Sequence, residues 1–240
     1  MSQFELSNKV AIVTGGGGTF HGVGSSIALT LAKAGARVVV VGRNRNSLDK
    51  VVEAIKDMGR DAVSVVADVT DPSQVDRLIL QASDVFGRID ILVNNAGKIS
   101  FGNPEDLEYQ EWCDCISLNL NGTYLCSVAV SREMIKQGGG KIVNIGSSSG
   151  IKGEEHAAHF AASKAAVINL TRSLAISWSV HNINVNCVSP GSIEVPEQGV
   201  PGMPEEEYIK RQQLQSADLN SLALPGKPQD IACLLYTSPS

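Results

Sequence analysis

The chain has 240 residues, 43% of them hydrophobic and 19% charged, which suits one large domain with a sizeable core and argues against a disordered chain. The formal net charge of −5 at pH 7 argues against nucleic acid as a main partner, because nucleic-acid-binding surfaces are usually basic. No stretch approaches the roughly 18 uninterrupted apolar residues of a membrane helix, and no signal peptide is recognisable, so we predict no membrane partner and a cytoplasmic location.

Short apolar runs rich in β-branched residues alternate with segments of helical periodicity along the chain. The apolar runs predict six strands, at 10–14, 36–42, 62–68, 89–95, 141–146 and 183–189. The periodic segments predict helices at 25–34, 47–58, 72–86, 109–137 with a break near Asn119, and 157–180. Near-continuous apolar strands are typical of a parallel sheet that is buried on both faces. The alternation therefore predicts an α/β fold with a doubly wound parallel sheet and right-handed crossovers.

A glycine-rich loop, TGGGGTFHGVG, joins the first predicted strand to the first predicted helix. Glycines let a pyrophosphate approach the backbone, and the helix N-terminus supplies free N–H groups and a partial positive charge. A glycine cluster on its own would indicate only a flexible turn, but this strand–loop–helix context predicts dinucleotide binding. The residues expected at the phosphates are Gly15, Gly22, Val23 and Gly24.

Arg43 follows the second predicted strand, where an acidic residue would bind the ribose hydroxyls of NAD(H) and repel a 2′-phosphate. An arginine there can form charge-assisted hydrogen bonds to the 2′-phosphate. We therefore favour NADP(H) over NAD(H) as the cofactor. The alternative is that Arg43 and Arg45 are solvated loop charges.

The five cysteines, Cys113, Cys115, Cys126, Cys187 and Cys233, are odd in number and have no regular spacing. We interpret them as free thiols in a reducing compartment, and we predict no metal site.

Farther along, a proline-containing segment with a polar, charged middle follows the last predicted strand. An insertion of that kind is usually a lid or a surface loop, and we favour a substrate lid at 194–225 over an inert loop.

Eight motifs occur in an order that resembles the short-chain dehydrogenase/reductase family, from about residue 6 to residue 232. They are TGG…GVG (14–24), DVTD (68–71), NNAG (94–97), SLNLNG (117–122), IVNIGSSSG (142–150), FAASKAAV (160–167), NVNCVSPG (184–191) and GKPQDIA (226–232). The resemblance implies one Rossmann-like domain over residues 1–232. It also implies hydride transfer between a nicotinamide dinucleotide and a small-molecule ketone or secondary alcohol.

The resemblance also assigns roles to individual residues. Along the cofactor it implies Asp68 and Val69 at the adenine, Asn95, Ala96 and Gly97 at the ribose, and Pro190, Gly191 and Ile193 at the nicotinamide end. Among the catalytic residues, Ser147 would orient the substrate carbonyl, Lys164 would bind the nicotinamide ribose, and Asn119 would position a water. Each has a plainer alternative: a serine in a strand-end turn, a solvated helix lysine and a residue that only breaks a helix.

Phe160 stands where the family has the tyrosine that donates a proton to the substrate. Loss of a general acid typically removes about 10²–10⁴-fold in rate. We favour an oxidoreductase impaired by Phe160; the alternative is a dinucleotide-binding pseudoenzyme with a binding or regulatory role. Replacement of the acid by His156 or His159, or by a water that passes a proton along Ser147 and Lys164, is a further alternative.

Other features bear on the site and the assembly. Six residues separate Gly15 from Gly22 where the family usually has three, and Val195 stands where it usually has a threonine. The tail 233–240 is expected to be foreign to the gene, so the last strand of the sheet is expected to be missing.

The predicted helix at 157–180 has small or apolar residues around most of its circumference. Such a helix is normally buried, which favours a homodimer or homotetramer. The sequence does not identify the substrate.

Overall fold

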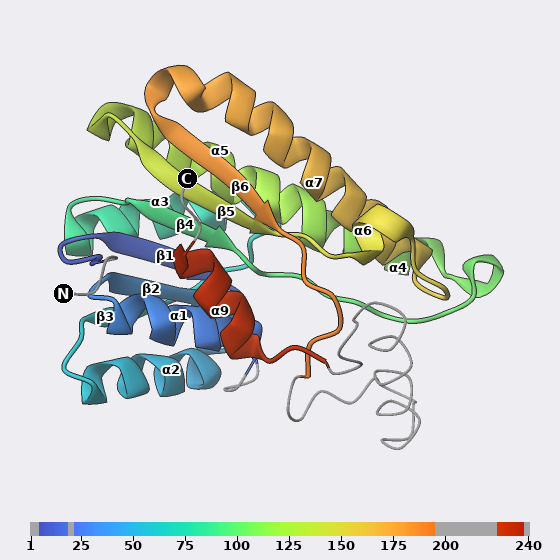
Figure 1. Cartoon of the computed structure of the whole chain (residues 1–240), viewed down its shortest axis with the longest axis horizontal. Coiled ribbons are helices and arrows are strands. Elements are labelled where there is room, and N and C mark those ends of the chain that lie inside the picture. Colours follow the sequence, from blue (N-terminus) through green and yellow to red (C-terminus); the bar gives the residue numbers. More distant parts are fainter. Residues whose placement is uncertain (1–4, 19–21, 195–224, 238–240) are drawn as a thin grey trace.

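The chain forms a six-stranded parallel sheet with helices on both faces (Figure 1). The computed structural model describes residues 5–18, 22–194 and 225–237. The strand order is β3-β2-β1-β4-β5-β6, and the strands are β1 (Val10–Thr14), β2 (Arg37–Gly42), β3 (Ala62–Val66), β4 (Ile91–Asn94), β5 (Gly140–Ile145) and β6 (Ile183–Val188). The order reverses between β1 and β4, which both lie at the centre. This arrangement confirms the predicted doubly wound α/β fold.

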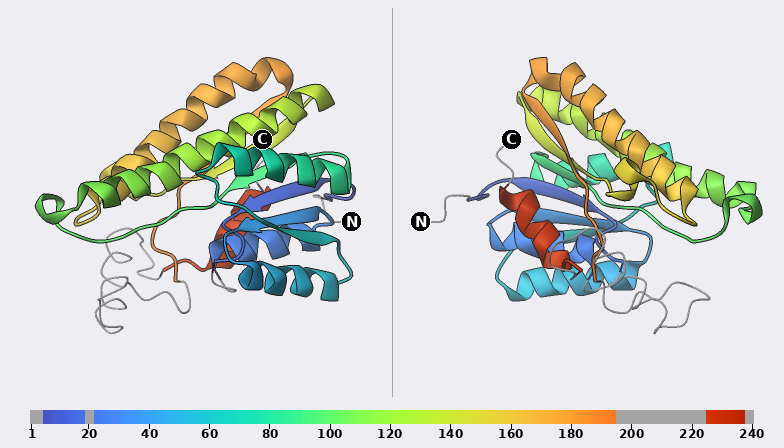
Figure 2. Two further views of the ribbon diagram at one scale, coloured as in Figure 1. Left: turned by 180° about the vertical axis from the view of Figure 1, so that it is seen from behind. Right: turned by 45° about the vertical axis from the view of Figure 1, so that its right-hand side comes forward.

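Two helical layers enclose the sheet (Figure 2). The helices are α1 (Val23–Lys33), α2 (Arg45–Asp57), α3 (Pro72–Phe86), α4 (Tyr109–Ile116), α5 (Gly122–Gln137), α6 (Ser149–Lys152), α7 (Ala158–Trp178) and α9 (Pro228–Thr237). Three short segments, η1 (Pro104–Asp106), η2 (Ser117–Asn121) and η3 (Ser179–His181), complete the described helical structure. None of the described helices is long and apolar enough to cross a membrane.

The sheet is apolar on both faces because successive residues of each strand point to opposite sides. In β1, Val10 and Ile12 belong to the core under α3, α5 and α7, whereas Ala11 and Val13 belong to the core under α1, α2 and α9. All five residues of β1 are buried. Two cores therefore stabilise the central strands, and the carboxyl ends of these strands carry the loops of the candidate site.

Two predicted boundaries differ from the structure in informative ways. The predicted break near Asn119 is instead the π-helical segment η2, through which the helical backbone continues from α4 into α5. Such π segments occur frequently at functional sites. The expected foreign tail begins inside α9, whose Ile231, Ala232 and Leu235 pack into the core beside α1. Residues 238–240 lie outside the described part of the chain.

Candidate functional site

A pocket of about 450 Å³ lies at the carboxyl ends of four neighbouring strands. Its walls come from the segments that follow β1, β2, β3 and β4, together with the first residues of α1 and α2 and Leu118 of η2. Ligands of open α/β sheets bind in the crevice where the strand order reverses. Ten residues predicted to bind a cofactor line this pocket: Gly15, Gly22, Val23, Gly24, Arg43, Asp68, Val69, Asn95, Ala96 and Gly97.

Sequence reasoning missed the other lining residues, which are Gly17, Gly18, Gly42, Asn44, Ser47, Ala67 and Leu118. The glycines of the first loop were visible as part of its glycine run. Asn44 was also detectable, since an asparagine before a helical segment indicates an N-cap. In the structure the Asn44 side chain accepts a hydrogen bond from the Ser47 backbone N–H at 3.2 Å, at the start of α2.

The phosphate end of the pocket fits a pyrophosphate. Gly22 caps α1 with an extended backbone, and the first turn of α1 has no acidic residue that would compete with an anion. The N–H groups of a helix's first turn have no partner within the helix, so they can bind phosphate oxygens. Gly15 has a φ of 66°, in the left-handed region that favours glycine. A Cβ at Gly24 would lie 2.3 Å from the Gly15 carbonyl oxygen, so the loop and α1 are packed closely.

Thr14 and Asn95 join this loop to the segment after β4. The Thr14 Oγ1 accepts hydrogen bonds from the backbone N–H groups of Asn95 at 3.0 Å and Ala96 at 3.1 Å. The Asn95 side-chain amide donates to the carbonyl oxygens of Thr14 at 3.1 Å and Gly15 at 3.3 Å. These bonds fix the two walls of the pocket relative to each other.

Two neighbouring arginines after β2 have different surroundings. The guanidinium of Arg45 donates to Ser64 Oγ at 2.7 Å and lies 3.8 Å from Asp49, so it is held against β3 and α2. Arg43 lines the pocket, and its side chain is 73% exposed. Its nearest carboxylate is that of Asp68, 3.9 Å away, which is only a loose ion pair. Arg43 is therefore the arginine available to a ligand phosphate.

The two residues predicted to contact the adenine, Asp68 and Val69, are held by local contacts. The Asp68 carboxylate accepts hydrogen bonds from the Thr70 N–H at 2.9 Å and the Thr70 hydroxyl at 2.7 Å. Val69 is 5% exposed, and a Cβ at Gly122 would lie 2.7 Å from its Cγ2. The first residue of α5 must therefore be small for Val69 to keep its place.

Asn119 is fully buried, and its side chain fixes the segment after β4. Its Oδ1 accepts from the Lys98 N–H at 2.8 Å, and its Nδ2 donates to the Lys98 carbonyl at 3.0 Å and to Ser163 Oγ on α7 at 2.9 Å. One amide group thus connects η2, the pocket wall and α7. The predicted role of Asn119 in positioning a water stays a prediction, whereas its structural role is direct.

Ser147, Phe160 and Lys164 lie around the end of β5. Ser147 is 9% exposed, and its Oγ accepts from the Ser149 N–H at 3.2 Å. Lys164 is 6% exposed, and its Nζ donates to the Ile145 carbonyl at 2.7 Å and lies 5.7 Å from the centre of the Phe160 ring. Burial lowers the pKa of Lys164 to about 8. Phe160 is half-buried on α7, one turn before the lysine.

The residues predicted at the nicotinamide end follow β6 and do not line the pocket of described residues. The Pro190 carbonyl accepts from the Ser148 N–H at 2.8 Å, which connects the segments after β5 and β6. Ile193 pairs with Gly226 in an isolated parallel bridge. Val195, most of the predicted lid (195–224) and part of the predicted insertion (19–21) lie outside the described residues.

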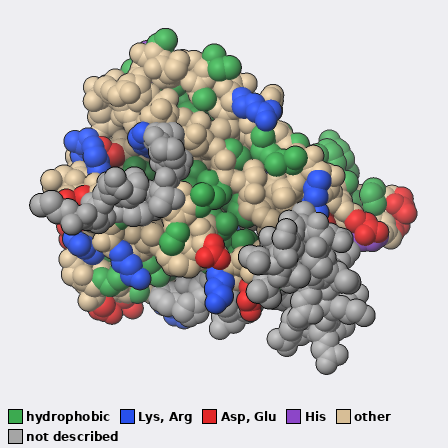
Figure 3. Space-filling model, viewed as in Figure 1, with side chains coloured by type: hydrophobic (Ala, Val, Ile, Leu, Met, Phe, Trp, Pro, Cys, Tyr) green, Lys and Arg blue, Asp and Glu red, His purple; other side chains and the backbone are tan. Residues whose placement is uncertain are grey.

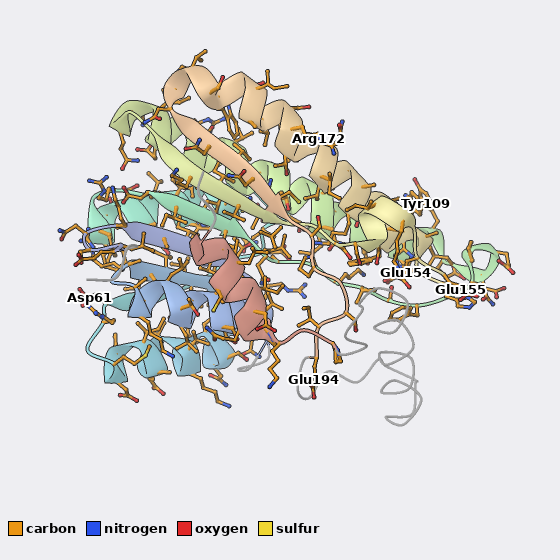
Figure 4. All side chains as sticks on the ribbon, in the orientation of Figure 1. Asp61, Tyr109, Glu154, Glu155, Arg172 and Glu194 are labelled. Atoms are coloured by element: carbon orange, nitrogen blue, oxygen red, sulfur yellow. The ribbon has the colours of Figure 1, made fainter. Side chains whose placement is uncertain are left out.

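The two histidines near Phe160 are engaged elsewhere. His156 precedes α7 with a φ of 57°, and its Nε2 lies 3.4 Å from Glu155. Glu154 and Glu155 lie at the same end of the molecule as Tyr109 (Figure 4). His159 is fully buried, and its Nε2 lies 2.9 Å from Ser100 Oγ, which donates to Glu111 at 2.5 Å. Neither contact supports the alternative in which one of these histidines acts as the proton donor.

The contacts of His159 determine its tautomer. Ser100 gives its only hydrogen to the carboxylate of Glu111, so His159 Nε2 must carry the hydrogen that it shares with Ser100. The buried Nδ1 is then an acceptor, and it has no partner among the described residues. Protonation would place a charge and an unsatisfied N–H in the interior. Accordingly, burial lowers the pKa of His159 below its ordinary 6.5, although the nearby Glu111 opposes this shift.

Acid is expected to destabilise the protein through His159. Because the pKa of His159 is lower in the folded protein, the unfolded chain binds a proton at this residue more readily. The contribution of neutral His159 to the free energy of unfolding is therefore complete above about pH 6.5 and declines as the pH falls below that value. His159→Gln keeps an N–H donor but does not titrate, so its melting temperature should fall less between pH 7.5 and pH 5. Differential scanning calorimetry would measure both proteins, with the exposed His181→Gln as the control. An equal fall in all three would contradict the prediction.

The described residues contain no group of three histidine, cysteine or acidic side chains placed to hold a metal ion. Their cysteines form no disulfide, and Cys115 and Cys126 are buried. Basic and acidic side chains are scattered over the face shown in Figure 3, without a large patch of one sign. The pocket at the strand ends is therefore the feature on which we base the function.

Comparison with known proteins gives consistent results. A family model described as short chain dehydrogenase matches residues 9–200. A 2-dehydro-3-deoxy-D-gluconate 5-dehydrogenase from Dickeya dadantii is 39% identical over 192 residues, which are 80% of this chain and 74% of the relative. A 3-oxoacyl-[acyl-carrier-protein] reductase from Synechocystis is 40% identical over 189 residues, which are 78% and 75% of the two chains. The crystal structure of a short-chain type dehydrogenase/reductase from Mycobacterium marinum superimposes with a TM-score of 0.85 at 33% identity, covering 97% of this chain and 88% of that one.

Proposed function

The chain belongs to the short-chain dehydrogenase family, and from this membership we propose that it is an NADP(H)-dependent oxidoreductase that interconverts a ketone and a secondary alcohol. The observation that carries the proposal is the pocket at the ends of β1 to β4, which ten residues predicted to bind a dinucleotide line together. The glycine cradle at α1 suits a pyrophosphate, and Arg43 suits a 2′-phosphate.

Each part of the site has a defined task in this proposal. A bound nicotinamide dinucleotide supplies or accepts the hydride. The N-terminus of α1 binds its pyrophosphate, Lys164 binds its nicotinamide ribose, and Pro190 to Ile193 hold its nicotinamide end. Ser147 donates a hydrogen bond to the substrate carbonyl, because its hydroxyl hydrogen has no acceptor among the described residues.

Replacing Arg43 with alanine tests the choice of cofactor. The variant should bind NADPH about fivefold more weakly, since an exposed charge-assisted contact contributes on the order of 1 kcal/mol. Its affinity for NADH should not change, because NADH has no 2′-phosphate. Isothermal titration calorimetry measures both nucleotides. Arg45→Ala is the matched control, since Arg45 is bound to Ser64 instead. Equal losses for both nucleotides would contradict the NADP(H) preference, and a parent protein that binds neither would contradict the proposed function.

Phe160 favours a second candidate, a pseudoenzyme that binds the dinucleotide for a binding or regulatory role. Both candidates require NADPH binding, so only turnover separates them.

We also propose that the protein acts in the cytoplasm as a homodimer or homotetramer. Ile176 near the end of α7 is 77% exposed, and Val180 just beyond it is 82% exposed. Both would be covered if this end of α7 contacted a second subunit, as the apolar character of the helix favours.

A further inference from the structure

Lys164 is a buried cation, and no carboxylate among the described residues is paired with it. The residue is 6% exposed, and within the described residues the one hydrogen-bond acceptor of its Nζ is the Ile145 carbonyl, 2.7 Å away. An ammonium group has three N–H donors, so two remain for other acceptors. Glu111 on α4 is paired with Lys98 at 3.0 Å and with Ser100 instead.

The ammonium lies against the wall of the pocket and at the end of β5, near Ser147, which is predicted to bind the substrate carbonyl. A Cβ built on Gly97, which lines the pocket, would be 3.5 Å from Lys164 Nζ. The Ile145 carbonyl that holds the ammonium is two residues before Ser147. The ring of Phe160 lies 5.7 Å from Nζ and can offer only its π-face to the cation. The cation is therefore an acidic group beside the position where the family has its phenol.

The other ionisable groups close to Nζ do not take over this role. Cys187 and Cys115 are the groups that favour its charged form, and the pKa of Cys115 is raised by burial. His159 is held by Ser100, and its lowered pKa keeps it neutral. Burial brings the pKa of Lys164 from 10.5 to about 8, so this ammonium can lose a proton near neutral pH, where an ordinary lysine cannot.

We propose that Lys164 is the proton donor of this chain, delivering its proton to the substrate carbonyl oxygen past the edge of Phe160, directly or through one water. The proposal rests on the proposed function. An N–H bond of the ammonium breaks, and an O–H bond forms on the carbonyl oxygen; a bound NADPH would supply the hydride that reduces the carbonyl carbon. The lysine is left as a neutral amine and takes a proton back from water before the next turnover.

Lys164→Arg, made in the parent and in Phe160→Tyr, separates a proton donor from a positioning residue. Arginine keeps the charge and the N–H donors but does not release its proton. We expect the substitution to lower the single-turnover rate of NADPH oxidation by about 100-fold or more in the parent. In Phe160→Tyr the loss should be at least tenfold smaller, because the phenol donates instead. Equal losses in the two backgrounds would overturn the proposal, since a purely positioning lysine costs the same in both.

Two further measurements do not depend on the arginine fitting its buried position. The first is the pH at which Lys164 titrates in the nucleotide-free parent, from the rate of reductive methylation of that residue followed by mass spectrometry. The second is the pH dependence of the single-turnover rate at saturating NADPH. We expect the rate to fall about tenfold per pH unit above the pH at which Lys164 titrates. If the parent protein binds NADPH but its single-turnover rate does not change across the pH at which Lys164 titrates, this proposal alone is overturned. If the parent protein binds no NADPH, the proposed function is overturned as well.

Discussion

Phe160→Tyr is expected to raise kcat/KM for ketone reduction by about 10²–10⁴-fold, the range that a general acid contributes. Phe160 is half-buried, and its ring lies 5.7 Å from Lys164 Nζ. A phenol at this position would therefore stand beside an ammonium, which lowers the pKa of the phenol and makes it a better proton donor at neutral pH. Because Lys164 already donates more slowly in our proposal, the gain should lie toward the lower end of this range.

The measurement is steady-state turnover of a panel of ketones with NADPH, together with NADPH affinity. Affinity should be unchanged, since the added hydroxyl replaces no contact with the nucleotide. Phe86→Tyr is the matched control, because Phe86 also has a cation over its ring, that of Arg37 at 5.2 Å, but lies on α3 outside the pocket. No gain in Phe160→Tyr would support the pseudoenzyme, in which the site has lost more than an acid.

Gly24→Ala is expected to disrupt both folding and nucleotide binding. The new methyl group would lie 2.3 Å from the Gly15 carbonyl oxygen and 2.5 Å from Asn95 Nδ2, so the backbone on one wall of the pocket must move. Overpacking of this kind costs about 1–3 kcal/mol, or roughly 2–12 °C in melting temperature for a domain of this size. If the glycine loop moves away from the new methyl group in the free protein, binding must bring it back. The same free-energy cost then weakens NADPH binding by about 5- to 150-fold.

Gly102→Ala provides the comparison, because a Cβ at Gly102 would meet no atom within 4 Å and its φ is not in the left-handed region. It should change the melting temperature by less than about 2 °C, as ordinary surface substitutions do. Calorimetry gives both melting temperatures, and titration with NADPH gives both affinities. If Gly24→Ala retained the stability and the affinity of the parent, the close contact between α1 and the glycine loop would not matter for binding.

The strands could be predicted from the sequence because each is a short apolar run, and all six lie within two residues of their predicted ends. The glycine loop and the strand-end residues were predictable for a related reason. Parallel strands bring their carboxyl ends to one edge of the sheet, so Gly15, Arg43, Asp68 and Asn95 share a pocket although they are far apart in the chain.

The contacts that make the site particular could not be predicted in this way. Ser100, Glu111 and His159 come from a loop and two helices, and no local pattern shows that they meet. The sequence predicted a break near Asn119 in the helix at 109–137. In the structure the helix continues, and a π segment accommodates the buried amide. The lowered pKa of Lys164 also depends on burial, which follows only from the packing of α7 against β5.

The buried amide of Asn119 has a mechanical consequence. The amide is hydrogen-bonded to both the N–H and the carbonyl of Lys98. It is also hydrogen-bonded to Ser163, on the helix turn that carries Lys164. Any tilt of α7 is therefore transmitted to the strand-end segment that walls the pocket. A ligand that shifts this turn of α7 is therefore expected to shift the pocket wall as well.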